Sequence, residues 1–164
     1  IRHAKTPVLV HRPKATKTKS AVGKFKKIMV PVDFSDKSCE TLAYAQSFAK
    51  DFGATLDIIH VVEPPIYPEF GYAHLAVKER AVLQSAKKEM TSFLESQKVD
   101  MDLVNTSSVK SGSAHFQITE WAKKKKTDLI ILSTRGHTGL THILLGSTAE
   151  RVVQHATCSV LVAR

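Results

Sequence analysis

Apolar and polar positions along this chain predict strands and helices in alternation. Five short apolar runs have the length and composition of buried strands, at residues 27–32, 55–62, 101–109, 128–133 and 158–163. Four longer segments between them repeat apolar residues at helical spacing, at residues 36–52, 74–97, 113–126 and 147–155. This order predicts an α/β fold, a doubly wound parallel sheet of five strands with helices on both faces.

End signals and inward faces support the helices. Ser35 or Asp36 is expected to cap the first helix, and Gly53 to end it. The last helix is expected to start at Ser147. Apolar residues at helical spacing are expected to face the core, and they are Leu42, Ala45, Ala49 and Phe52, then Leu75, Val82, Ala86, Met90, Phe93 and Leu94, then Ala114, Ile118, Trp121 and Ala122.

The beginning of the chain repeats its end. Residues 3–12, HAKTPVLVHR, align with residues 155–164, HATCSVLVAR, and six of the ten positions are identical. We interpret residues 1–12 as the last strand of an upstream sister domain, residues 13–24 as a linker and residues 25–164 as the main domain. An isolated strand needs a partner, so residues 7–11 are expected to pair with the strand around residues 159–163, of this chain or a neighbour.

Charge is unevenly distributed. The net charge is +9, yet residues 1–27 hold nine basic and no acidic residues, which leaves fifteen of each sign in residues 28–164. A basic segment without an aromatic platform or a base-reading helix binds polyanions only loosely. We therefore interpret it as a solvated linker and expect no specific nucleic-acid partner.

The sequence also indicates the compartment. It contains neither an apolar run of the roughly 18 to 20 residues that a membrane helix needs nor a signal-peptide pattern, which favours a cytoplasmic protein. The cysteines, Cys39 and Cys158, are far apart in sequence and are expected to be reduced, buried thiols.

Residues 128–151 carry the strongest functional signal, because they combine a buried strand, a glycine-containing loop and the start of a helix. Gly136, Gly139 and Gly146 punctuate the loop, and Ser147 and Thr148 open the helix. Free N–H groups and the helix dipole favour an anion at such a junction, and the two hydroxyls add donors. The segment predicts a phosphate site.

A carboxylate is expected nearby. Asp33 follows the first predicted strand, and the loop at 133–137 follows the fourth. Ligands of such sheets bind beyond the carboxyl ends of the strands, where the strand order reverses. If these two strands are neighbours there, both features meet in one crevice. Asp33 alone also fits a simple turn before a helix cap.

Several other sites are not supported. The chain lacks Gly-x4-Gly-Lys-Ser/Thr, and no Gly-x-Gly-x2-Gly follows the first strand, which argues against P-loop enzymes and dinucleotide oxidoreductases. Its histidines show no zinc-ligand spacing, and its serines show no recognisable hydrolase triad.

Three blocks give the chain a family resemblance. VPVDFSD at 30–36, IIHVVEP at 58–64 and STRGHTGLTHILLGSTAERVV at 133–153 are similar to the universal stress protein family, and the resemblance covers about residues 25–164. Family nucleotide binders carry Gly-x2-Gly-x9-Gly-Ser/Thr. Gly136, Gly146 and Ser147 match that pattern, whereas Ser133 replaces its first glycine. The resemblance implies a strand order of 3-2-1-4-5.

The resemblance also implies a ligand, ATP or AMP with Mg²⁺ or Mn²⁺, and a set of site residues. Asp33 would bind the ribose or the metal ion. Family dimers pair through the last strand, so a homodimer or tandem pseudo-dimer is expected. The implied nucleotide-binding residues are Pro31, Val32, Asp33, Val61, Leu132, Ser133, Arg135, Gly136, His137, Gly146, Ser147 and Thr148.

The sequence thus favours an adenine-nucleotide (ATP, ADP or AMP) binding domain that acts as a stress sensor or regulatory module. We expect binding rather than turnover, because no dedicated catalytic base is visible. Two alternatives stay open, a nucleotide-free dimerisation or interaction module and a slow ATPase. Ser133 is the residue that decides between nucleotide binding and the nucleotide-free alternative. If the position requires a positive φ, serine is strained by about 1 to 2 kcal/mol. If a phosphate lies close to it, that phosphate meets the hydroxymethyl group of the serine.

Overall fold

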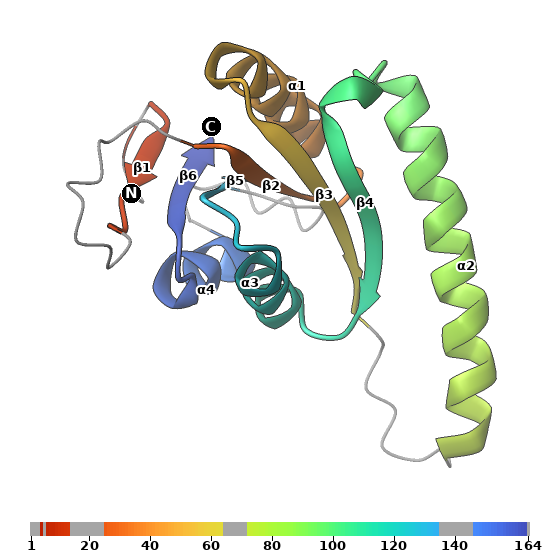
Figure 1. Cartoon of the computed structure of the whole chain (residues 1–164). Helices are drawn as coiled ribbons and strands as arrows, with labels where there is room; N and C mark the ends of the chain where they lie inside the picture. The colour runs from red at the N-terminus through yellow and green to blue at the C-terminus, as the bar shows by residue number, and fades with distance from the viewer. Residues whose placement is uncertain (1–3, 5, 14–24, 64–71, 135–145, 164) are drawn as a thin grey trace.

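The computed structural model describes residues 4, 6–13, 25–63, 72–134 and 146–163, with backbone alone for 72–78. Strands and helices alternate through most of it, and Figure 1 shows a central twisted sheet with helices on both sides. The elements are β1 (Val8–Val10), β2 (Lys27–Val32), α1 (Asp36–Phe52), β3 (Thr55–Val62), α2 (Tyr72–Ser96), the 3₁₀ turn η1 (Met101–Leu103), β4 (Val104–Ser111), α3 (Ala114–Lys125), β5 (Leu129–Ser133), α4 (Ser147–His155) and β6 (Ser159–Ala163).

The sheet confirms the predicted fold class and corrects its strand count. Its order is β1-β6-β5-β2-β3-β4, and β2 to β6 are parallel in the expected 3-2-1-4-5 arrangement. The prediction of five strands is wrong by one, because β1 adds an antiparallel sixth strand beside β6 (Figure 1). Its pairing with β6 of the same chain confirms the partner expected for residues 7–11.

Two apolar layers enclose the sheet, because successive side chains of a strand point to opposite faces. In β2, Ile28 and Val30 pack with α1 and α2, whereas Met29 packs with α3 and α4. All three side chains are fully buried, as is most of β5. Strands buried on both faces explain the continuous apolar runs in the sequence.

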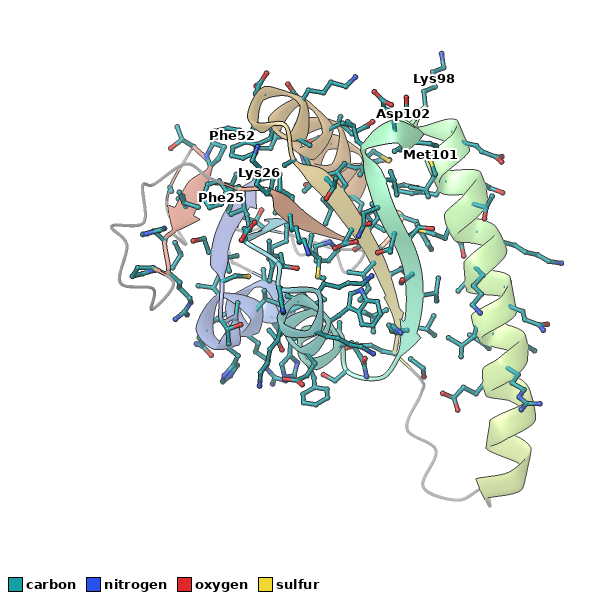
Figure 2. All side chains as sticks on the ribbon, viewed as in Figure 1. Phe25, Lys26, Phe52, Lys98, Met101 and Asp102 are labelled. Carbon is teal, nitrogen blue, oxygen red and sulfur yellow. The ribbon has the colours of Figure 1, made fainter. Side chains whose placement is uncertain are left out.

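Helix α1 begins and ends where its capping signals predict. Ser35 is the N-cap, and its side chain accepts a hydrogen bond from the N–H of Ser38 at 3.3 Å. Gly53 follows the last turn with φ of 57°, a left-handed conformation that favours glycine. Lys26 Nζ donates to the Phe52 carbonyl at 3.1 Å (Figure 2).

The expected inward position of Phe52 is wrong. Phe52 is 36% exposed, although its ring stacks on Phe48 with centroids 4.3 Å apart and lies 6.2 Å from the ring of Phe25 (Figure 2). An aromatic side chain in the last helical turn can cover the rim of a core without entering it.

The second half of helix α2 contacts the core, and Leu75, also expected to face inward, has a side chain outside the described residues. Ala86, Met90, Phe93 and Leu94 are buried as predicted, but Val82 is 48% exposed, so the expected inward face is wrong there. None of the helices in the described part of the chain has the length and apolar character required to cross a membrane.

Two further expectations need correction. The third predicted strand starts at Val104 instead of Met101, because Asp100 caps a 3₁₀ turn over residues 101–103 by accepting from the N–H of Asp102. Cys39 is only half-buried, whereas Cys158 is buried as expected, and neither cysteine forms a disulfide within the described residues.

Candidate functional site

The candidate site lies where strands β2 and β5 separate. Their pairing extends to Met29 and Ile130, whereas β2 stays paired with β3 as far as Val32. Pro31 lies just past the last β2–β5 pair and has no N–H with which to extend a ladder. The strand order reverses at this seam, which is where such sheets bind ligands.

A cleft of about 430 Å³ occupies the seam at the carboxyl ends of the strands. That volume lies within the range of small-molecule sites, about 300–1,000 Å³. Both apolar side chains and polar groups line it. The lining residues are Pro31, Val32, Asp33, Ser38, Ile59, His60, Val61, Glu63, Ala114, Ile118, Leu132, Ser133, Thr134, Gly146, Ser147, Thr148, Ala149 and Val152.

Asp33 stands on one wall of the cleft, directly after β2. Its Oδ1 accepts hydrogen bonds from the backbone N–H of Ser35 at 3.2 Å, from the Ser35 hydroxyl at 2.6 Å and from the Ser38 hydroxyl. The Asp33 N–H donates in turn to Ser38 Oγ at 2.9 Å. Phe34, between them, has φ of 63°, a conformation that costs energy for a bulky residue. The β2–α1 turn therefore fixes the orientation of the carboxylate.

The start of helix α4 also lines the cleft. The Gly146 N–H donates to the Thr134 carbonyl at 2.8 Å, which joins the two ends of the segment between β5 and α4. A Cβ on Gly146 would lie only 3.2 Å from that carbonyl oxygen, so close approach rather than φ, which is −58°, explains the glycine. Ser147 and Thr148, both exposed, follow in the first helical turn. N–H groups of such a turn suit an anion.

The backbone at Ser133 shows whether this position requires the conformational freedom of glycine. Ser133 is the last residue of β5, is paired with Ala163, and does not have a positive φ. The position therefore does not require glycine for conformational reasons, and serine adds no backbone strain. Serine differs from glycine here by a side chain at the lining of the cleft.

Most of the predicted site residues come together around this cleft. Three of them, Arg135, Gly136 and His137, lie outside the described residues. The predicted residues that line the cleft are Pro31, Val32, Asp33, Val61, Leu132, Ser133, Gly146, Ser147 and Thr148.

His60 and Glu63 are site residues that the sequence analysis missed. His60 Nδ1 lies 2.8 Å from the Val32 carbonyl, and its ring stacks on Phe34 with centroids 4.2 Å apart. Since a carbonyl only accepts, Nδ1 carries the hydrogen. The Val32–His60 register creates this contact, so local sequence gives no signal for it.

Glu63 is the first residue after β3, and its Oε1 accepts from the Ala114 N–H at 2.7 Å. It caps α3, whose N-cap Ser113 makes no side-chain cap hydrogen bond. Applying the strand-end rule to the second predicted strand identifies this residue.

Two chemical properties of the described residues bear on the site, the reactivity of the Cys39 thiol and the grouping of potential metal ligands. Burial, followed by the nearby Asp36 carboxylate, raises the pKa of the Cys39 thiol, which keeps it protonated at neutral pH and poorly nucleophilic. In the described residues, no group of three His, Cys, Asp or Glu side chains is arranged to hold a metal ion.

A doubly wound sheet with this cleft defines a class of small-ligand-binding α/β domains, and comparison with known proteins identifies the family. The model of the universal stress protein family matches residues 24–164. A universal stress protein of Methanocaldococcus jannaschii is 39% identical over 146 residues, which cover 85% of this chain and 82% of that protein. The chain belongs to the universal stress protein family.

Solved structures share the fold. Universal stress protein UspA from Lactobacillus plantarum has a TM-score of 0.66 and 28% identity, over 86% of this chain and 99% of that one. A universal stress protein in complex with cAMP has a TM-score of 0.57 and 20% identity, over 86% of this chain and 98% of that one, and at that identity the likeness concerns the fold.

Proposed function

We propose that this chain binds an adenine nucleotide, ATP, ADP or AMP, in the cleft between β2 and β5, and acts as a sensor or regulatory domain in the stress response. One observation carries the proposal: a fixed carboxylate, Asp33, and a helix start, Gly146 to Thr148, line one cleft. A nucleotide presents ribose hydroxyls and phosphates to just such a pair of groups. Cys39 and Cys158 form no disulfide within the described residues, which fits the proposed cytoplasmic location.

The walls suggest how the ligand is oriented. Val61 and Leu132 offer apolar surface to the base, and Pro31 and Val32 line the adenosine side. Asp33 accepts from the ribose hydroxyls or binds Mg²⁺ or Mn²⁺ beside the phosphates. The phosphates lie at the N–H groups and hydroxyls of Ser147 and Thr148, and Arg135, Gly136 and His137 are proposed to complete their site. The known adenine-nucleotide complex of a same-fold relative, with cAMP, supports this ligand class.

Calorimetry with ATP, ADP and AMP, each with Mg²⁺ or Mn²⁺, tests the proposal. We expect saturable binding at one site per chain, weakened at least about tenfold by Asp33→Ala, which corresponds to about 1.4 kcal/mol. Asp36→Ala is the matched control, because it removes the same charge from an exposed side chain three residues away and should change affinity less than about twofold.

Two other outcomes are informative. Absence of saturable binding at millimolar nucleotide by the folded chain overturns the proposal and favours a nucleotide-free interaction module. ATP turnover that Asp33→Ala abolishes indicates a slow ATPase in this cleft, whereas turnover that the substitution leaves unchanged comes from another site or another protein.

A further inference from the structure

Three ammonium groups surround one aromatic ring on the surface of this chain. The ring belongs to Trp121 of α3, the only tryptophan in the sequence, and Lys110 of β4 places its Nζ 4.0 Å from the ring centre. The Nζ atoms of Lys124 and Lys125, in the last turn of α3, lie 5.3 Å and 5.1 Å from the same centre. These distances are those of cation–π contacts. We call the four residues the lysine–tryptophan cluster.

The cluster carries positive charge without a counter-ion. In the described part of the chain, none of its three ammonium groups has a carboxylate within ion-pair distance. The dipole of α3 favours lysines in its last turn, which accounts for Lys124 and Lys125 but not for Lys110, which comes from a strand. An indole ring attracts a cation by only about 0.5–2 kcal/mol and has no net charge to neutralise three of them. The arrangement therefore suits an anion.

The cluster also lacks hydrogen-bond acceptors. Trp121 Nε1 is buried and has no hydrogen-bond partner within the described residues. A buried donor without an acceptor costs free energy, and the lysine ammonium groups are donors only. Oxygen atoms are what this group of side chains would bind.

A cavity beside the cluster has the same character. It has a volume of about 380 Å³, and Lys110 lines it together with residues of α2 and β4. Its polar lining consists of Lys87 and the hydroxyls of Thr91, Ser107 and Ser108, and no carboxylate is among the described residues that line it. The edge of the sheet at β4 thus offers an anion both space and donors.

We propose that the lysine–tryptophan cluster binds a small, multiply charged phosphate anion, at a site separate from the nucleotide cleft. Lysines bind phosphate as point charges, whereas arginine matches planar carboxylates, and the cluster contains no arginine. Lys110 lies over the single ring, so no platform is left on which nucleic-acid bases could stack in succession. None of the four residues lines the nucleotide cleft, and the proposal is independent of nucleotide binding.

A titration of the full chain with inorganic pyrophosphate at constant ionic strength, followed by proton–nitrogen correlation NMR, tests the proposal. Because the chain has one tryptophan, the spectrum contains one indole N–H peak, which belongs to Trp121. We expect this peak to move saturably, with a midpoint below about 1 mM. Binding at the nucleotide cleft would instead move the amide peaks of Ser147 and Thr148, so one experiment reads the two sites separately.

Lys110→Met tests the cluster directly, since methionine removes the charge and keeps an apolar chain over the ring. We expect pyrophosphate to bind this variant about tenfold more weakly, as the loss of a charge-assisted contact predicts. Lys123→Met is the matched control, because it removes the same charge from an exposed position of the same helical turn, outside the cluster. At physiological ionic strength it should change the midpoint less than about twofold.

Four results overturn the proposal. The first is an indole peak that stays in place at millimolar pyrophosphate, whether or not the cleft peaks move. The second is a movement that sodium chloride of equal ionic strength reproduces. The third is an equal loss of affinity in the two variants, which have the same net charge and would then show general attraction only. The fourth is a single-stranded oligonucleotide that moves the indole peak at lower concentration than pyrophosphate does, which assigns the cluster to nucleic acid.

Discussion

The two ends of the parallel sheet use carboxylates differently. At the amino end, Asp57 of β3 is 2% exposed and accepts from Asn105 Nδ2 at 2.8 Å and Thr106 Oγ1 at 2.6 Å. Asp128 accepts from the N–H groups of Lys26 and Lys27 at 2.9 and 3.0 Å. These contacts join strands that are distant in sequence.

At the carboxyl end, Asp33 is held by hydroxyls and an N–H of its own turn, and its side chain lines the cleft. In this molecule the buried Asp57 connects neighbouring strands, whereas Asp33, which accepts hydrogen bonds from residues of its own turn, lines the cleft. Substitutions at the amino end should therefore affect stability, and substitutions at the carboxyl end should affect ligand binding.

The largest effect is expected for Asp57→Ala. Loss of two hydrogen bonds to a buried charged group should lower the free energy of unfolding by about 2–3 kcal/mol. Urea denaturation measures this loss, and calorimetry of the folded fraction should show ATP affinity within about twofold of the parent. Asp51→Ala, at an exposed position of α1, is the control and should change stability by less than about 0.5 kcal/mol. A strong loss of ATP affinity with an unchanged free energy of unfolding would show that Asp57 serves ligand binding instead of the fold.

A smaller effect on the fold is expected for Gly146→Ala. The added Cβ would meet the Thr134 carbonyl at 3.2 Å, so residues 134 and 146 must move apart by a few tenths of an ångström. We expect a loss of about 1 kcal/mol in stability and a several-fold loss of nucleotide affinity, since the start of α4 shifts. Denaturation and calorimetry on one preparation give both values. Unchanged nucleotide affinity would show that the contact between Gly146 and Thr134 does not position the ligand site.

Ser133→Gly distinguishes backbone strain at this position from obstruction of the ligand by the serine side chain. Because Ser133 lies in a strand without a positive φ, glycine relieves no strain and should lower stability by about 0.5–1 kcal/mol through its greater freedom in the unfolded chain. We expect ATP affinity to change by less than about threefold. A tenfold gain would show that the serine side chain obstructs the phosphates.

The smallest effect concerns the solvent-exposed pair of Lys50 Nζ and Asp100 Oδ2, 3.0 Å apart. Lys50 lowers the pKa of Asp100, so the pair adds stability above the unfolded-state pKa of about 4 and loses it as pH falls through the folded-state value. The difference in Tm between the parent and Asp100→Asn should be present near pH 6 and should shrink as pH falls below about 4. A difference that persists at low pH points to the 3₁₀ turn instead.

Local signals and non-local contacts explain how much the sequence could predict. The parallel strands and α1 were predictable because β5 is apolar on both faces and Ser35 and Gly53 are capping residues. The sixth strand was predictable from the repeat alone. η1 was not, because Met101 and Leu103 extend the apolar pattern of β4 while the Asp100 cap bends the backbone.

The residues of the candidate site also differ in whether local sequence could predict them. Asp33 follows β2 and Ser133 ends β5, so the sequence placed both at strand ends, and the family resemblance supplied the strand order that makes these strands neighbours. The place of His60 depends on its stacking with Phe34 and on a carbonyl of the neighbouring strand, which only the folded register creates. The serine at position 133 required structural data to interpret, because φ is not written in a sequence.

The far edge of the sheet has a consequence for solubility. β4, VNTSSVKS, is the edge strand opposite β1, and it is mostly polar. Its Lys110 lies with Nζ 4.0 Å from the centre of the Trp121 ring. A polar, lysine-bearing edge resists the addition of strands from other molecules, because it offers an incoming strand little apolar surface and a charge to desolvate. Growth of the sheet into a cross-β aggregate is thus disfavoured at this edge.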